Sequence, residues 1–477
     1  MSSFNPSPAS YSHTIKNRRM AIATAISLVF LIGIDLLASR QILFFDNSGQ
    51  TVIFVLTALG AHGVGAWILL RYCKKISSEL TKLPFIGKML LAVVTIQIFL
   101  LGILLSILFN NAIACPGYFS FCMGVTRHLA VAVNAIGSAS ATIVLGLISY
   151  KFFSWYRFST KNWMILLYGL AAATLAMSIG LDAADKILLL QVVEEKSPAG
   201  AIPQSAFLYK TNEKYHGQVQ YKVVGPDTTT LYVVPSSLIP LHKFLIYLVS
   251  DTPYFFTWAS TFLLLRQYYL SSRITDKFPV KYYILLSIPL ALYLIGSGLI
   301  ISLPPDETYR YYFRIVFRAG TIGSSVLFGL AFFIITRNVK SRILSVEKVK
   351  DYLAISSIGI VLIGIANETS ALQQTFGAAA HSLVLLSSFL FSMGLYYSAI
   401  SVSHDNSLRI SIKRSIPDLV KNIGTAQMEG ETIVKITKSV RHNQEKMQEE
   451  KGICSSITDE NIKEYLEQVI RETKSQF

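Results

Sequence analysis

Charged residues are scarce in this chain of 477 residues, and their scarcity limits the class of protein to which it can belong. Asp, Glu, Lys and Arg make up 15% of the sequence, hydrophobic residues make up 52%, and the mean hydropathy is +0.48. Soluble globular domains usually carry about 25% charged residues. The composition therefore excludes an ordinary soluble protein and places most of the chain in a lipid bilayer.

Residues that carry chemistry are also few. The chain has four cysteines and eight histidines, and none of them cluster at the spacing of metal ligands. It lacks a phosphate-binding glycine loop, a nucleophile elbow and a zinc-protease motif. We therefore expect no metal, no cofactor and no enzymatic activity.

The chain does have ten apolar stretches, each long enough to cross a bilayer. A helix of about 20 residues spans about 30 Å of hydrocarbon with every backbone group hydrogen-bonded internally. The first stretch is longer than the apolar core of a secretory signal, so we expect it to be an uncleaved span. The expected spans are 20–43, 51–71, 89–109, 128–150, 163–182, 242–265, 283–303, 312–335, 352–372 and 379–402.

Basic residues fall on alternate connections between these spans. The N-terminal tail and the connections 71–88, 151–162, 266–282 and 336–351 hold 20 Lys and Arg, whereas the alternate short connections 38–50, 110–128, 303–314 and 373–377 hold 4. Because basic loops are retained in the cytoplasm, this asymmetry predicts a multi-pass protein of the cell membrane with both termini cytoplasmic. The formal net charge of +15 then reflects contact with anionic lipid, and no nucleic-acid partner is expected.

The domain organisation follows from this topology. We expect a cytoplasmic N-terminal tail at 1–19, an all-α transmembrane bundle at 20–403 and a helical cytoplasmic tail at 404–477. Within the bundle, the extracytoplasmic loop 183–241 contains two alternating stretches around Gly225-Pro226-Asp227, which predict a β-hairpin and a small β-rich cap.

The cytoplasmic tail carries two predicted amphipathic helices. Apolar faces are marked by Ile433, Ile436, Val440 and Met447 in the first and by Ile462, Leu466, Val469 and Ile470 in the second, which Ser456 is expected to cap with Asp459. Two interpretations remain open. The helices pack on the inner loops, or residues 425–474 bind a protein partner or a second copy of the chain.

Cys115 and Cys122 lie in the same outer loop, on the oxidising side of the membrane. Pro116 and Gly117 can turn the chain between them, so we expect a disulfide, the alternative being two buried thiols.

Polar residues inside the spans are the candidates for a functional site, because a charge in the bilayer is costly unless it has a partner. Asp35, Asp251 and Glu368 all lie in the outer half of the expected spans, and His62 lies near the middle of the second span among glycines that allow close helix approach.

Arg310, Arg314 and Arg318 are spaced by four residues and form one column on a helix. We expect Arg318, the deepest, to pair with Asp35, Asp251 or Glu368. This column is interpreted as an internal ion-pair network, as a site for a small ligand or ion from the outside, or as arginines that reach the membrane surface.

Two functions of different classes fit these observations. The first is a receptor-like sensor, whose outward-facing polar pocket detects a ligand and whose tail passes the signal on. The second is a secondary transporter of a small solute or ion, favoured by Asp251-Thr252-Pro253, which places a helix breaker beside an intramembrane carboxylate.

Finally, the stretch from Gly394 to Arg409, followed by Asn422 to Met428, resembles a group of archaeal multi-pass membrane proteins with a short helical cytoplasmic tail. The resemblance extends to the long outer loop and the region of the eighth span. Those proteins have no assigned activity or site residues, so the resemblance implies a fold and no function.

Overall fold

The computed structural model describes most of the chain, and the statements below concern only the described residues. These are 16–30, 48–77, 84–114, 123–158, 162–188, 193–195, 208–210, 219–224, 229–234, 252–266, 280–302, 320–321, 323–334, 344–372, 377–404, 418–451 and 458–475.

Long helices make up nearly all of the described residues. Their apolar sequences satisfy the backbone internally, which is the form that a chain must take in hydrocarbon. The helices of the bundle are α2 (Ser48–Ser77), α3 (Pro84–Ala114), α4 (Met123–Phe158), α5 (Trp163–Leu188), α7 (Val280–Ser302), α9 (Leu344–Leu372) and α10 (Gly377–His404), with further helical segments at 16–30, 252–266 and 323–334. The all-α class expected from the sequence is thus found.

Three of these helices are long and apolar enough to cross a membrane by length and composition. They are Ala135–Phe158 of α4, Trp163–Leu181 of α5 and Val349–Ala366 of α9. Shorter apolar stretches occur at Lys88–Leu104, Ile284–Ile295, Gly323–Ile334 and Leu383–Ser398. These findings indicate membrane association.

Four short strands follow α5 in the chain. They are β1 (Val193–Glu195), β2 (Leu208–Lys210), β3 (Val219–Val224) and β4 (Thr229–Val234). All pairs are antiparallel, the order is β1-β4-β3-β2, and β3 pairs with β4 so that Tyr221 lies opposite Tyr232.

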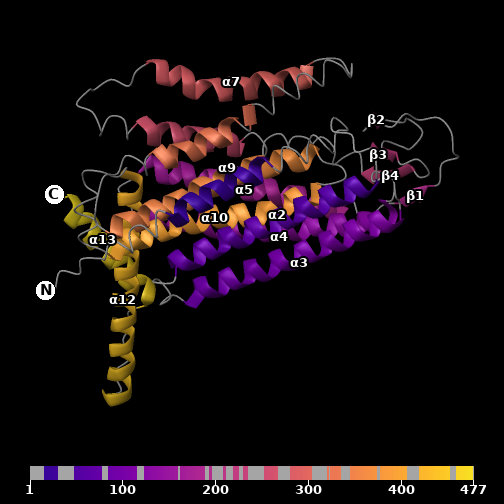
Figure 1. The fold of residues 1–477 in the computed structure, drawn as a ribbon. Helices are drawn as coiled ribbons and strands as arrows, with labels where there is room; N and C mark the ends of the chain where they lie inside the picture. Colours follow the sequence, from indigo (N-terminus) through magenta and orange to yellow (C-terminus); the bar gives the residue numbers. More distant parts are fainter. Residues whose placement is uncertain are drawn as a thin grey trace.

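The bundle helices run side by side, and the strands lie at one end of them (Figure 1). The opposite end packs against the tail helix α12 (Asp418–Lys451), which runs across the axes of the bundle helices. We call these the far end and the α12 end. The last helix, α13 (Asp459–Ser475), packs against α12.

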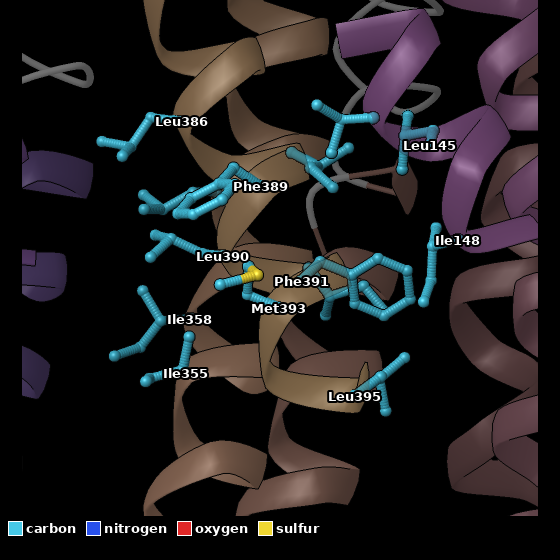
Figure 2. Packing of buried hydrophobic residues seen from close by; sticks show 14 of the residues in the cluster. Leu145, Ile148, Ile355, Ile358, Leu386, Phe389, Leu390, Phe391, Met393 and Leu395 are labelled. Carbon is cyan, nitrogen blue, oxygen red and sulfur yellow. The ribbon is translucent and has the colours of Figure 1, made fainter. Parts of the chain in front are cut away.

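The core is centred on α9 and α10. Almost every described side chain of α10 from Leu383 to Leu395 is buried, between α4 on one side and α9 on the other. Figure 2 shows Phe389, Leu390 and Met393 of α10 between side chains of these two neighbours. Because α10 has no polar face to turn toward water, its hydrophobic pattern is continuous, as expected for a helix surrounded by others.

Glycine and serine allow α9 and α10 to approach closely. A Cβ atom on Gly359 would overlap the backbone nitrogen of Phe391 and lie 2.8 Å from the Ser387 carbonyl oxygen. At the other crossing, a Cβ on Gly394 would overlap Ser356 and the Tyr352 carbonyl oxygen. Small residues at such positions bring two backbones into contact, which is the main source of packing energy between helices in lipid.

Serine hydroxyls in this core donate to backbone carbonyl groups. Ser357 Oγ donates to the Gly329 carbonyl at 2.6 Å, Ser387 Oγ to the Leu383 carbonyl at 2.6 Å, and Ser149 Oγ of α4 to the Gly169 carbonyl of α5 at 3.0 Å. The first and third of these bonds join neighbouring helices. Each satisfies a hydroxyl that has no water to bind.

In the tail, α12 begins at Asp418 and α13 at Asp459. Thr458 Oγ1 accepts a hydrogen bond from Asn461 N at 3.3 Å and caps the start of α13, whereas Ser456, the cap expected from the sequence, lies outside the described residues. Thr458 lies immediately before the first helical residue, which is the position from which a side chain reaches the free amides of the first turn.

The contact between α9 and α10 generates a stability prediction. Replacing Gly359 by Ala should lower stability by about 1–3 kcal/mol, because the added methyl group meets backbone that cannot rotate away. The melting temperature of the purified protein in detergent should fall by several degrees. Gly146→Ala is the matched control, since Gly146 is exposed and nothing lies within 4 Å of its Cβ position. Equal melting of the two variants would contradict the close approach.

Candidate functional site

Most of the site residues expected from the sequence lie outside the described residues. These are Asp35, Asp251, Arg314 and Arg318, together with the disulfide candidates Cys115 and Cys122. Glu368 belongs to α9, but its side chain is outside the description. The pairing of Arg318 and the disulfide therefore stay predictions.

His62 is the one candidate whose surroundings are described. It lies in the middle of α2, is 4% exposed, and occupies the same helix face as the buried residues Ala66, Leu69 and Cys73. Its Nδ1 atom has no hydrogen-bond partner among the described residues. The neighbouring glycine Gly65 lets Leu28 approach, since a Cβ there would lie 2.8 Å from Leu28 Cδ2. The expected close helix approach around His62 is therefore found at Gly65.

Three further buried polar residues lie near the middle of their helices. Gln97 of α3 is 2% exposed, and neither of its amide atoms has a partner among the described residues; the same holds for the hydroxyls of Ser388 and Ser392 on α10. Helices α2, α3 and α10 contact one another. We call His62, Gln97, Ser388 and Ser392 the mid-bundle polar set.

The mid-bundle polar set can bind, but it offers little for catalysis. Leaving a buried polar atom without a hydrogen bond lowers stability by about 1–3 kcal/mol, so a water or a polar ligand that binds to these atoms would recover that free energy. Its members are amide, imidazole and hydroxyl groups, which donate and accept without a fixed charge. In the described part of the chain, no group of three or more His, Cys, Asp or Glu side chains is placed to hold a metal ion.

A buried ion pair closes the α12 end of the bundle. Arg18 Nε, from the helical segment 16–30, donates to Asp351 Oδ1 of α9 at 2.5 Å, and the two side chains are 18% and 4% exposed. Charge-assisted hydrogen bonds of this length are strong, and one partner without the other is costly at such burial. The pair therefore fixes the first helix against α9.

Tyr72 of α2 lies beside this pair, one residue past the expected span 51–71. Burial and, after it, the Asp351 carboxylate raise the pKa of Tyr72 well above its ordinary value, although Arg18 acts in the opposite direction. The phenol therefore stays neutral at physiological pH, and the fixed charges of Arg18 and Asp351 dominate the local field.

Aromatic residues connect the bundle to α12. Trp155 Nε1 of α4 donates to Gln427 Oε1 of α12 at 2.7 Å, and the Trp155 ring stacks on Tyr396 of α10 with centroids 6.3 Å apart. Lys151 Nζ lies 5.9 Å from the Tyr396 ring centroid. Gln427 Nε2 in turn donates to Glu431 Oε1 at 2.8 Å. One indole group therefore touches both a bundle helix and the tail.

The docked half of α12 is small and apolar where it meets the bundle. Ile423 and Ala426 are each 1% exposed and belong to the same core cluster as α4 and α10, and a Cβ on Gly430 would lie 3.4 Å from Phe158. Beyond Thr437 nearly every residue of α12 is exposed. The tail is thus part of the packed core for its first five turns or so, at about 3.6 residues per turn.

Sequence reasoning missed both features of the α12 end. Arg18 reads as one of three topogenic cations and Asp351 as a loop residue, and nothing local shows that residues 333 positions apart meet. Trp155 reads as a membrane-interface anchor. The one available signal was that Asp351 is an acid in a strongly basic connection, directly before an apolar run.

Removing one member of the Arg18–Asp351 pair should destabilise the protein. Arg18→Gln leaves a 4%-exposed carboxylate without its cation, so we expect a loss of about 3–5 kcal/mol. Asp351→Asn in the same chain should recover part of it. Lys446→Gln, which removes an exposed pair with Glu450, should cost less than about 0.5 kcal/mol. Thermal unfolding in detergent compares the wild type with these three variants and with Asp351→Asn alone, and additive effects of Arg18→Gln and Asp351→Asn would disprove the coupling.

Comparison with protein-family models, curated proteins and solved structures finds no match for this chain. The likeness to archaeal multi-pass membrane proteins accordingly stays an expectation.

Proposed function

We propose that the chain crosses the membrane ten times, with both termini and the α12 end in the cytoplasm and the strands β1 to β4 outside. Two observations support this topology. Basic residues partition 20 to 4 between alternate connections, and the described helices α2 to α5, α7, α9 and α10 each contain an expected span almost entirely. The strands lie at the end opposite α12, as the topology requires for the loop 183–241.

Within this topology, we propose a receptor-like sensor without enzymatic activity. The observation that carries the proposal is the hydrogen bond between Trp155 and Gln427, together with the stacking of Trp155 on Tyr396. A transporter has no need to build a cytoplasmic helix into its core. In a sensor, a shift of α4 or α10 changes the docking of α12 directly.

The packing of α10 can carry a helix shift from the far end of the bundle to α12. Helix α10 runs from the far end to Tyr396, contacts α4 and α9 along its length, and meets α12 at its own end. Close-packed helices move as rigid units between discrete arrangements and do not bend gradually. A ligand bound near Asp35, Asp251, Arg314, Arg318 or Glu368 therefore has a mechanical path to the tail.

The transporter alternative is favoured by a different observation, the mid-bundle polar set. His62, Gln97, Ser388 and Ser392 place polar atoms without a partner among the described residues near the centre of three contacting helices. Polar groups at this depth mark solute or ion paths in many membrane proteins. Flux of a probe ion through proteoliposomes would support this alternative.

The topology predicts which segments are accessible from outside. An engineered cysteine at Thr229 at the start of β4, and another at Ser439 in α12, are probed in intact cells with a thiol reagent that does not cross membranes. Position 229 should react and position 439 should react only after permeabilisation. The opposite pattern would overturn the topology.

The sensor proposal predicts coupling between the outer arginine column and α12. Arg318→Gln should change hydrogen exchange of the peptides covering 423–437 by about fivefold or more, since coupling energies are typically about 1–3 kcal/mol. Trp155→Phe removes the donor to Gln427 and should raise hydrogen exchange of the same peptides about 2–12-fold, which gives the size of effect expected when α12 loses its contact with the bundle.

Trp163→Phe is the control for loss of an indole, because Trp163 is 66% exposed. Exchange is measured by mass spectrometry on the full protein in lipid nanodiscs. If Arg318→Gln leaves α12 unchanged while Trp155→Phe raises its exchange, docking is real and the sensor proposal is wrong.

A further inference from the structure

The second half of α12, residues 438–451, extends beyond the bundle. Residues 438–450 are exposed except for Val440 and Gln444, which are half-buried. In Figure 1 this half of the yellow helix continues past α3, the outermost helix on that side of the picture, and still runs across the bundle axes. If the bundle spans a bilayer, a helix in this direction lies parallel to the membrane surface.

Contacts of the first half fix the depth at which α12 runs. Gln427 accepts its hydrogen bond from Trp155, and Gly430 lies against Phe158, the last residue of the apolar stretch Ala135–Phe158. Tryptophan and tyrosine near the end of a span lie at the level of the lipid headgroups. The helix axis therefore runs at the headgroup level or just beyond it.

The side of α12 that faces the bundle can be followed into the exposed half. Ile423, Ala426, Gly430 and Thr437 are spaced by three, four and seven residues and share one face. The same spacing continues through a second group of residues. These are Arg441, Gln444, Gln448 and Lys451, which we call the cationic stripe.

The chemistry of this face changes where the helix leaves the protein. Beneath the bundle it consists of Ile, Ala, Gly and a buried Thr; beyond the bundle it carries two cations and two amides beside the half-buried Val440. The acidic residues of this half lie on other faces, and the nearest, Glu445, forms an exposed pair with Arg441 at 3.1 Å. An exposed pair of this kind is worth only about 0.3–0.5 kcal/mol, so phosphate can compete for the guanidinium.

We propose that the cationic stripe binds the phosphate groups of anionic phospholipids, so that residues 438–451 lie on the membrane surface. Arg441 offers a planar guanidinium that matches phosphate, and Lys451, the last residue of α12, offers a point charge. The amides of Gln444 and Gln448 can donate to headgroup oxygens between them. The proposal uses the membrane placement of the bundle but does not depend on the sensor function.

The test compares two faces of the same helix in the full protein. An environment-sensitive fluorophore is attached through Gln448→Cys on the stripe or through Ser439→Cys, nine residues away and therefore half a turn round the helix. In both proteins Cys115, Cys122 and Cys454 are replaced by Ser, while the buried Cys73 is kept. Nanodiscs contain phosphatidylcholine alone or an equal mixture with phosphatidylglycerol.

Emission at position 448 should shift to the blue in the acidic nanodiscs, and emission at 439 should not. Salt should reverse the shift, because it screens surface charge. Arg441→Gln should lower the ratio of bound to free helix about fivefold, the value for one basic residue near an anionic surface. Lys446→Gln is the matched control, since it also breaks an exposed pair with a glutamate but lies on another face.

Three results would overturn the proposal: equal shifts at positions 439 and 448, a shift independent of phosphatidylglycerol, or equal effects of the two charge substitutions. A shift that appears only when two copies share a nanodisc would assign the face to a second copy of the chain. The cysteine-accessibility pattern of positions 229 and 439 tests the topology separately, so a failure of either is recognised.

Discussion

The close contact between α9 and α10 is the constraint on which the rest of the bundle depends. In lipid, burial of apolar surface does not distinguish a neighbouring helix from a lipid tail, so helices associate through close packing and hydrogen bonds. Gly359 and Gly394 remove the side chains that would hold these backbones apart, and Ser356 Oγ of α9 donates to the Phe391 carbonyl of α10 at 3.3 Å. Once α10 is fixed against α9, its other faces provide the surfaces on which α3, α4 and α12 pack.

At the α12 end, hydrogen bonds between polar side chains add to close packing. Arg18 and Asp351 are far apart in the sequence and largely removed from water, so each charge offsets the cost of burying the other. Together they fix the first helix against α9. Trp155 fixes the tail helix α12 against α4 by donating a hydrogen bond to Gln427. Both contacts use a group that also suits a membrane interface.

The two halves of α12 show how one helix serves two environments. Under the bundle its inner face is small and apolar, which allows it to enter the core; beyond the bundle the same face carries Arg441 and Lys451. The amphipathic pattern read from the sequence, Ile433 with Ile436, Val440 and Met447, overlaps the docked face in part: Ile433 is buried and Val440 half-buried, whereas Ile436 and Met447 are exposed. Hydrophobic periodicity therefore predicted the helix and one edge of the face that docks.

The sequence by itself determined the helical class and the positions of the apolar helices, because a run of apolar residues without charge can satisfy its backbone in only one way in hydrocarbon. It also indicated His62 as a buried polar residue, since its neighbours are glycines and apolar residues on both sides. Only the tertiary structure decided which polar groups meet. Arg18 forms an ion pair with Asp351, and Trp155 donates a hydrogen bond to Gln427. The side chains of Gln97, Ser388 and Ser392 are buried without hydrogen-bond partners among the described residues. The physical reason is that helix periodicity is a local property, whereas the rotation and pairing of helices depend on how whole surfaces of small and large side chains fit together.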